Sequence, residues 1–181
     1  MRSHSWKIAL CGVMGAVSVA IMLLGAVIPV AMFIAPALAS ILVMLVCAEC
    51  GRRLAWTEYA AVSLLSVLFV PDREVALVFV FLGYYPLVKP RFDRLRPRLV
   101  RGVCKVLYFN GSVLALYALL YSLFFPGQLA SELAGAGLAL AAASMLIGNA
   151  AFLLLDKALV NLLQLYCRVW QPRLHRMLGR S

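Results

Sequence analysis

The sequence contains few charged residues, and acidic ones are the rarest among them. Of 181 residues, 13% are charged and seven are Asp or Glu, whereas soluble domains carry roughly 25% charged residues. Hydrophobic residues make up 65% of the chain, and the mean hydropathy is +0.97. This composition excludes an ordinary soluble domain. The length fits a single domain of about six membrane-spanning helices of roughly 20 residues each, without room for a second domain.

Other absences exclude further classes. The apolar runs are continuous and do not alternate with polar residues, which excludes a membrane β-barrel. We find no Walker motif, HExxH, GxSxG or plausible catalytic triad, so we expect no enzymatic activity, no cofactor and no metal. Cys47 and Cys50 have CxxC spacing, but no matching His or Cys pair lies nearby. We interpret them as small residues at a helix end.

Apolar runs separated by Pro, Gly and charges predict an all-α, polytopic membrane protein. We expect a compact bundle of six transmembrane helices in one domain, residues 1–181. The predicted spans are residues 8–28, 36–48, 54–70, 75–88, 106–125 and 138–158, and the last helix is expected to continue to about residue 170. The first run follows a basic residue, as in a signal peptide, but it is much longer than a signal-peptide core. It is therefore predicted to be a retained helix.

The basic residues indicate the orientation of this bundle. The segment KPRFDRLRPRLVRGVCK, residues 89–105, carries seven basic residues and one Asp. If successive spans alternate sides, fifteen Lys and Arg residues fall on one side, and only Arg73 falls on the other. The positive-inside rule then places both termini and the 89–105 loop in the cytoplasm. Contact with anionic membrane lipids is a secondary expectation. Nucleic-acid binding is not expected, because no groove-reading context is present.

Polar side chains within the apolar spans are the first candidates for function, because they are costly in lipid. Counted by depth, several fall in the cytoplasmic third of their helices and form a predicted intramembrane polar cluster. Its members are Glu58, Tyr84, Tyr85, Asn110, Asp156 and Lys157, with Lys89 at the same level. One interpretation is a hydrogen-bonded cluster that locks the helix ends together. The other is a proton relay or an ion site.

The string GYYPLVKP, residues 83–90, is the most distinctive local motif. Pro86 lacks an N–H and predicts a kink in the fourth span, while Gly83 permits close approach of a neighbour. The two tyrosines are typical of anchors at a membrane interface.

Small residues recur on the first span at a spacing of four, at Gly12, Ala16 and Ala20. In lipid, such a stripe marks a helix contact, either within the chain or with another protein. Near the opposite face, Tyr117, Tyr121 and Ser144 lie in the outer halves of the last two helices. A pocket there would suit a small, largely apolar ligand.

With six short spans, both ends inside, a small-residue stripe and an apolar first loop, the chain resembles the substrate-binding S subunit of energy-coupling factor transporters. The resemblance implies uptake of a vitamin or precursor across a bacterial cytoplasmic membrane. It also implies docking on a transmembrane coupling subunit with a pair of ATPases. Gly12, Ala16 and Ala20 would be the docking stripe, and Met32 and Phe33 would belong to a gating loop. Tyr117, Tyr121 and Asn149 would lie on the ligand side. The identity of the ligand stays open.

Two alternatives remain beside this hypothesis. The first is a non-transporting scaffold of envelope machinery. Its basic loop and its C-terminal segment, with Trp170, Leu174, Met177 and Leu178 among basic residues, would recruit cytoplasmic partners or anionic lipid. The second is a membrane-embedded enzyme that uses Asp156 and Glu58.

Overall fold

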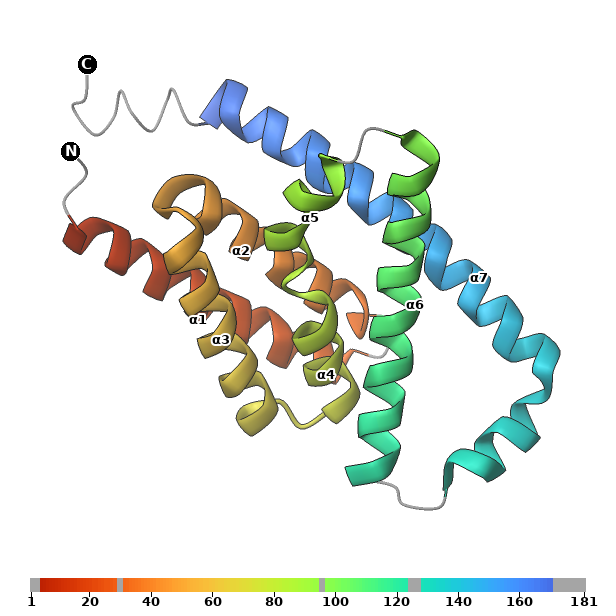
Figure 1. Ribbon diagram of the computed structural model, residues 1–181. Coiled ribbons are helices and arrows are strands. Elements are labelled where there is room, and N and C mark those ends of the chain that lie inside the picture. Colours follow the sequence, from red (N-terminus) through yellow and green to blue (C-terminus); the bar gives the residue numbers. More distant parts are fainter. Residues whose placement is uncertain (1–3, 29–30, 95–96, 124–127, 171–181) are drawn as a thin grey trace.

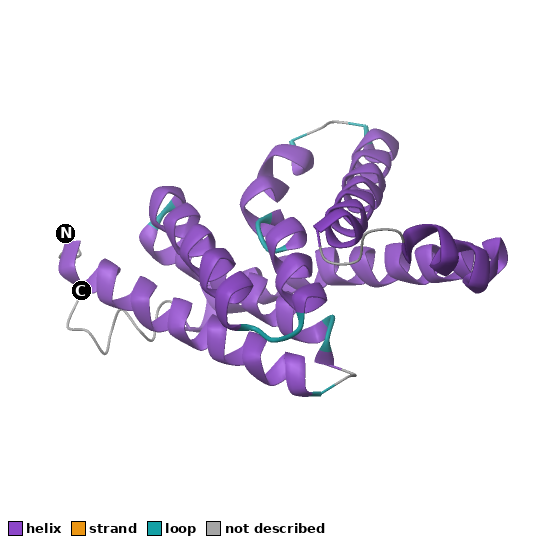
Figure 2. Ribbon diagram, turned by 90° about the horizontal axis from the view of Figure 1, so that it is seen from below, coloured by secondary structure: helices purple, strands orange, loops and turns teal. Residues whose placement is uncertain are grey.

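The computed structural model describes residues 4–28, 31–94, 97–123 and 128–170, and within these ranges all regular structure is helical. The helices are α1 (His4–Val27), α2 (Ile34–Cys50), α3 (Arg52–Phe69), α4 (Arg73–Leu82), α5 (Tyr85–Asp93), α6 (Arg98–Leu123) and α7 (Gln128–Leu165), followed by a π-helical turn (Tyr166–Trp170). Short connections join them (Figure 2). The segment from residue 171, which includes most of the C-terminal scaffold motif, lies outside the described residues.

Four of these segments are long and apolar enough to cross a membrane: Ser5–Val27, Arg73–Asp93, Leu99–Leu123 and Ala142–Leu165. Many large apolar side chains on them face outward, as lipid-facing side chains do. α1, α2 and α3 pack together on one side, α4 and α5 lie in the middle, and α7 crosses α6 on the other side (Figure 1). The buried core joins Met22 of α1, Val43 of α2 and Phe79 of α4.

α1 and α2 are in close contact at Gly25. A Cβ atom placed there would lie 2.2 Å from the Cβ of Ala35, far inside van der Waals contact. Glycine at this position therefore sets the distance between the two helices.

α2 turns into α3 through a single residue, Gly51, whose φ of +93° is the only positive value among the described residues. Its N–H donates to the Cys47 carbonyl at 3.1 Å. A side chain would be strained in this backbone conformation, so glycine permits the abrupt reversal.

The fourth predicted span is broken into two helices at the place where Pro86 predicts a kink. α4 ends at Leu82 and α5 begins at Tyr85, with Pro86 in its first turn. The break leaves carbonyls at the end of α4 without helical donors. The Tyr108 hydroxyl of α6 donates to the Phe81 carbonyl at 3.0 Å, and the Tyr59 hydroxyl of α3 donates to the Val80 carbonyl. Neighbouring helices thus satisfy the backbone groups that the break exposes.

The segment 89–105 is not a loop, contrary to the sequence-based expectation. α5 continues to Asp93 and α6 begins at Arg98, so the connection between them is short. α7 likewise begins at Gln128, not near residue 138, and helical structure runs through the π-helical turn to Trp170. Charge ends a membrane span but not necessarily a helix, since a helix continues readily into water.

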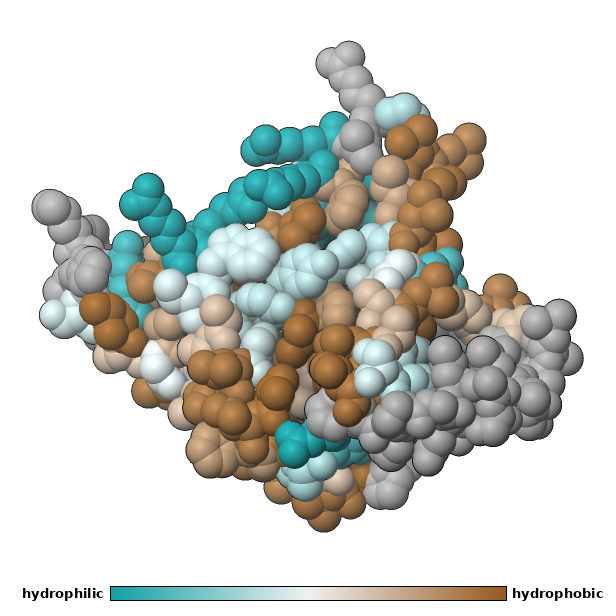
Figure 3. Space-filling view, turned by 60° about the horizontal axis from the view of Figure 1, so that its bottom comes forward, coloured by the Kyte–Doolittle hydropathy of each residue, from teal (hydrophilic) through white to brown (hydrophobic). Residues whose placement is uncertain are grey.

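Hydrophilic side chains gather mainly along one edge of the molecule, above a largely apolar surface (Figure 3). We call the end where α2 meets α3 and α5 meets α6 the basic end. Arg52, Arg53, Arg91 and Arg94 are exposed there.

Candidate functional site

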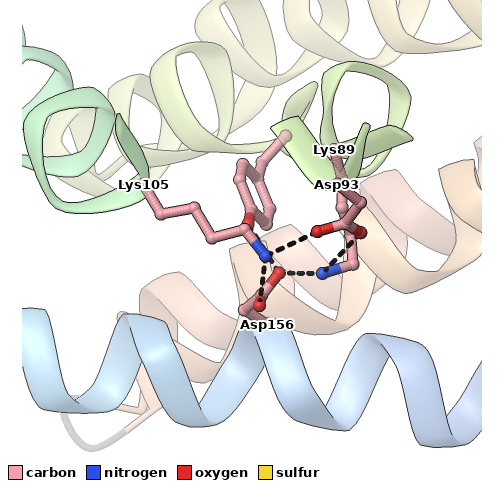
Figure 4. Close-up of polar contacts among 5 residues, drawn as sticks. Lys89, Asp93, Lys105 and Asp156 are labelled. Carbon is pink, nitrogen blue, oxygen red and sulfur yellow. Dashed lines mark hydrogen bonds and ion pairs between the residues drawn. The ribbon is translucent and has the colours of Figure 1, made fainter. Parts of the chain in front are cut away.

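A network of four charged side chains joins three helices at the basic end (Figure 4). Asp156 projects from α7, Lys89 and Asp93 from α5, and Lys105 from α6. The Nζ of Lys105 lies 2.7 Å from one oxygen of Asp156 and 2.8 Å from one oxygen of Asp93. Lys89 pairs with the other Asp156 oxygen and lies 3.5 Å from Asp93. Two carboxylates and two ammonium groups therefore alternate around the network.

Three of the four network side chains are largely removed from solvent, whereas that of Asp93 is 36% exposed. The side chains of Lys89 and Lys105 are 9% and 7% exposed, and that of Asp156 is 12% exposed. Asp156 also accepts a hydrogen bond from the Tyr85 hydroxyl at 2.6 Å. Burying a charge is costly unless it is paired and hydrogen bonded, and every member here has an oppositely charged partner. The arrangement therefore fixes α5, α6 and α7 relative to one another.

A cavity of about 470 Å³ opens beside this network. Its lining combines the four network residues with Arg101 of α6 and with Lys157, Val160 and Asn161 of α7. Lys157 is exposed. Four of the eight lining residues are cationic and two are acidic.

Only part of the predicted intramembrane cluster comes together. Tyr85 and Asp156 are hydrogen bonded, and Lys157 lines the adjacent cavity. Lys105 and Asp93 belong to the network, although the sequence analysis assigned them to a loop. The spacing of four between Lys89 and Asp93 was an available signal, because it places both side chains on one face of a helix.

Glu58 lies apart from this network, between α3 and α1. It is 3% exposed, and neither carboxylate oxygen has a hydrogen-bond partner. Its Cγ is 3.8 Å from the position a Cβ would take at Gly15 of α1. Glu58 therefore occupies an apolar helix interface as a solitary acidic group.

Tyr84 belongs to a group of packed aromatic rings. Its ring stacks on Trp56 at 6.1 Å and contacts Tyr59 and Tyr108 at 5.7 Å each. These rings cover the break between α4 and α5. The role of Tyr84 here is packing at the break.

Asn110 and Asn149 pair with each other and not with the charged network. The side-chain amide of Asn149 donates to the side-chain oxygen Oδ1 of Asn110 on α6 at 2.8 Å and to the Met145 backbone carbonyl of its own helix at 2.8 Å. This bond joins α6 to α7. Asn149, expected on the ligand side, thus contributes to helix association.

The remaining residues of the expected ligand side occupy separate environments. The Tyr117 hydroxyl donates to Glu74 of α4 at 2.7 Å, and the Tyr117 and Tyr121 rings stack at 6.3 Å. Met32 packs against the main core, whereas Phe33 is exposed. Ser144 is exposed and donates to the Leu140 carbonyl of its own helix at 2.9 Å.

The small-residue stripe of α1 faces outward. Gly12, Ala16 and Ala20 are all exposed, and no atom of a neighbouring helix lies within 4 Å of the Cβ position at Gly12. Gly15 and Gly25 instead face α3 and α2. α1 thus uses one set of small residues for contacts within the bundle and leaves another uncovered.

Fold and site together define an all-helical protein with membrane-length apolar helices and a buried charged network at one end. Comparisons with protein-family models, with curated proteins and with solved structures find no match.

Proposed function

We propose that the protein is an integral membrane protein of the bacterial cytoplasmic membrane, with its basic end in the cytoplasm. We further propose that it is the substrate-binding subunit of an energy-coupling factor type importer. It would capture a small, largely apolar molecule and dock through α1 on a transmembrane coupling subunit driven by an ATPase pair. The four membrane-length helices support the location in a membrane. The biased distribution of Lys and Arg supports the orientation.

The observation that carries the docking proposal is the uncovered stripe on α1. Helices in lipid associate where small residues allow close backbone contact. Gly25 already makes such a contact with α2, whereas Gly12, Ala16 and Ala20 are exposed. A second membrane helix packed along this stripe would gain the contacts that α1 lacks.

The charged network favours binding and structural roles over catalysis. Lys89, Lys105 and Asp156 are each held by oppositely charged partners. These contacts stabilise helix positions and leave none of the three as a free acid or base. A ligand pocket is expected at the opposite end, near Tyr117 and Tyr121.

Co-purification from the native host tests the docking proposal. The wild-type protein, tagged and gently solubilised, is expected to retain a membrane subunit and two ATPases. Gly12→Leu is expected to lose them, because a leucine would hold a partner helix away. Gly111→Leu is the matched control: Gly111 is also an exposed helical glycine with open space at its Cβ position. Wild-type protein without these subunits, or full retention by Gly12→Leu, would refute the proposal.

A scaffold that recruits cytoplasmic partners is the second candidate. The exposed Arg52, Arg53, Arg91 and Arg94 at the basic end favour it. Such a protein would co-purify with envelope proteins and would lose them when these arginines are replaced, whereas Gly12→Leu would have no effect.

A further inference from the structure

Glu58 lies within a close contact between α1 and α3, which pack side by side (Figure 1). The Cβ position of Gly15 on α1 is 3.6 Å from Cγ2 of Val62 and 3.8 Å from Cγ of Glu58. One turn earlier along both helices, the Cys11 thiol donates to the Leu54 carbonyl at 3.7 Å. Leu54, Glu58 and Val62 are spaced by four and share one face of α3. At Gly15, α1 presents only backbone to the Glu58 side chain.

No opposite charge balances Glu58 among the described residues. It is 3% exposed, and both of its carboxyl oxygens lack a hydrogen-bond partner. The titratable group that faces it from α1 is the Cys11 thiol, which supplies no positive charge. Lys7, the nearest lysine of α1, is more than two turns from Gly15 along the helix.

The charged groups of α3 itself and of the other helices that pack on it are engaged elsewhere or exposed. Arg52 donates to the Leu87 carbonyl, Arg53 and Arg91 are exposed, Glu49 of α2 bonds Tyr166, Arg73 and Glu74 of α4 bond the Val67 carbonyl and Tyr117, and Lys89 and Asp93 of α5 belong to the charged network.

An ionised carboxylate in this position would be a buried charge without compensation. Such a charge is so costly that the group adopts its neutral form instead. For a glutamate, the neutral form is the one that carries a proton. The close packing of α1 on α3 therefore requires a proton on Glu58.

Loss of that proton has a structural consequence, because the carboxylate then needs water. Glu58 lies less than two turns from Arg52, the first residue of α3 at the basic end. Separation of α1 from α3 at Gly15 would admit water from that end.

We propose that Glu58 is a proton-binding site and that its proton controls the packing of α1 on α3. With the proton bound, α1 lies closed against α3. When the carboxyl O–H bond breaks and the proton passes to water at the basic end, α1 separates and the carboxylate is hydrated. The site is independent of the outward-facing stripe on α1, so this inference does not depend on the proposed transport role.

Infrared spectroscopy of the purified full-length protein tests for the proton. A protonated carboxyl group has a carbonyl stretching band that a carboxylate lacks. At neutral pH we expect this band in the wild type and its loss in Glu58→Gln, which keeps the shape of the side chain without a carboxyl group. Glu49→Gln is the matched control and should retain the band, because Glu49 is also buried but accepts a hydrogen bond from Tyr166 at 2.9 Å.

The same spectra also decide against the proposal. It is overturned by a wild-type spectrum without the band or by a band that Glu58→Gln retains in full. A Glu58 band that persists at every pH at which the protein stays folded overturns it as well.

Alkylation of Cys11 tests the movement of α1. In a variant with Cys11 as its only cysteine, a maleimide should react slowly while α1 is closed, because the half-buried thiol contacts α3. Thiols react faster at higher pH in any protein, so the comparison is with the same variant carrying Glu58→Gln, which cannot ionise. We expect equal rates at neutral pH and a faster rate with Glu58 at the alkaline pH where its infrared band disappears. Equal rates there would overturn the proposed control of α1.

Discussion

Asp156 of α7 accepts a hydrogen bond from the Tyr85 hydroxyl of α5 at 2.6 Å and forms an ion pair with Lys105 of α6 at 2.7 Å. One carboxylate thus joins α7 to α5 and α6. Its partners Lys105 and Tyr85 are 51 and 71 positions away in the sequence. Its neighbour Lys157 is exposed. Two adjacent residues therefore have different roles: one holds the bundle together and the other faces the cavity.

Replacement of Asp156 is expected to be strongly destabilising. Asp156→Asn leaves Lys89 and Lys105 with the partly exposed Asp93 as their remaining carboxylate partner, and loss of one partner of a buried pair costs about 3–5 kcal/mol. Equilibrium unfolding in detergent micelles measures the change. Lys157→Gln is the control and should stay within about 0.5 kcal/mol of the wild type. Asp156→Asn with wild-type stability would show that the network does not hold the helices.

Each of the two tyrosine hydroxyls that donate at the break between α4 and α5 is expected to stabilise the folded protein on its own. Tyr59→Phe and Tyr108→Phe each leave a carbonyl of α4 without a donor, which should lower the free energy of unfolding by about 1–3 kcal/mol. Thr57→Val serves as control, because the exposed Thr57 hydroxyl donates only to the Leu54 carbonyl of its own helix. Equal effects of all three substitutions in the same unfolding assay would contradict this account.

Glu58 is expected to reduce stability in the wild type. Since its buried carboxylate lacks a hydrogen-bond partner, Glu58→Met should raise the free energy of unfolding by about 1–3 kcal/mol. Glu49→Met provides the contrast, because Glu49 accepts a hydrogen bond from Tyr166 at 2.9 Å and its loss should destabilise. A destabilised Glu58→Met protein would mean that Glu58 has a binding partner in the membrane.

Two glycines of α1 should respond oppositely to the same change. Gly25→Ala forces a Cβ into Ala35 and is expected to cost about 1–3 kcal/mol through overpacking. Gly12→Ala meets open space and should be neutral or slightly stabilising, because alanine favours helix. Thermal unfolding of the two variants side by side measures this. A tolerated Gly25→Ala would show that α1 and α2 are not in close contact there.

The sequence predicted the all-helical architecture because the apolar runs are continuous, and four of the six predicted spans match described helices that are long and apolar enough to cross a membrane. Pro86 predicted a kink in the fourth span, since a residue without an N–H cannot continue the hydrogen-bond pattern, and the structure has a break between α4 and α5 there. The extension of α5 to Asp93 and the start of α6 at Arg98 were missed, because a charged segment was equated with a loop.

The composition of the charged network could not be predicted from depth alone. Glu58, Asn110 and Asp156 lie at similar calculated depths, yet their side chains meet different neighbours. Depth follows from counting along a helix, whereas the direction in which a side chain points depends on how the helices pack. The pairing of Asp156 with Lys105 rests on the crossing of α6 and α7, which no local pattern records.

The sidedness of the basic end is the central claim, because the proposed importer orientation depends on it. Single cysteines in a variant lacking the native thiols test it in whole cells with a membrane-impermeant maleimide. Pro71→Cys, in the exposed connection between α3 and α4, should be labelled from outside. Arg94→Cys, in the exposed connection after α5, should be labelled only after the cells are permeabilised. Labelling of Arg94→Cys in intact cells, with Pro71→Cys protected, would contradict the account.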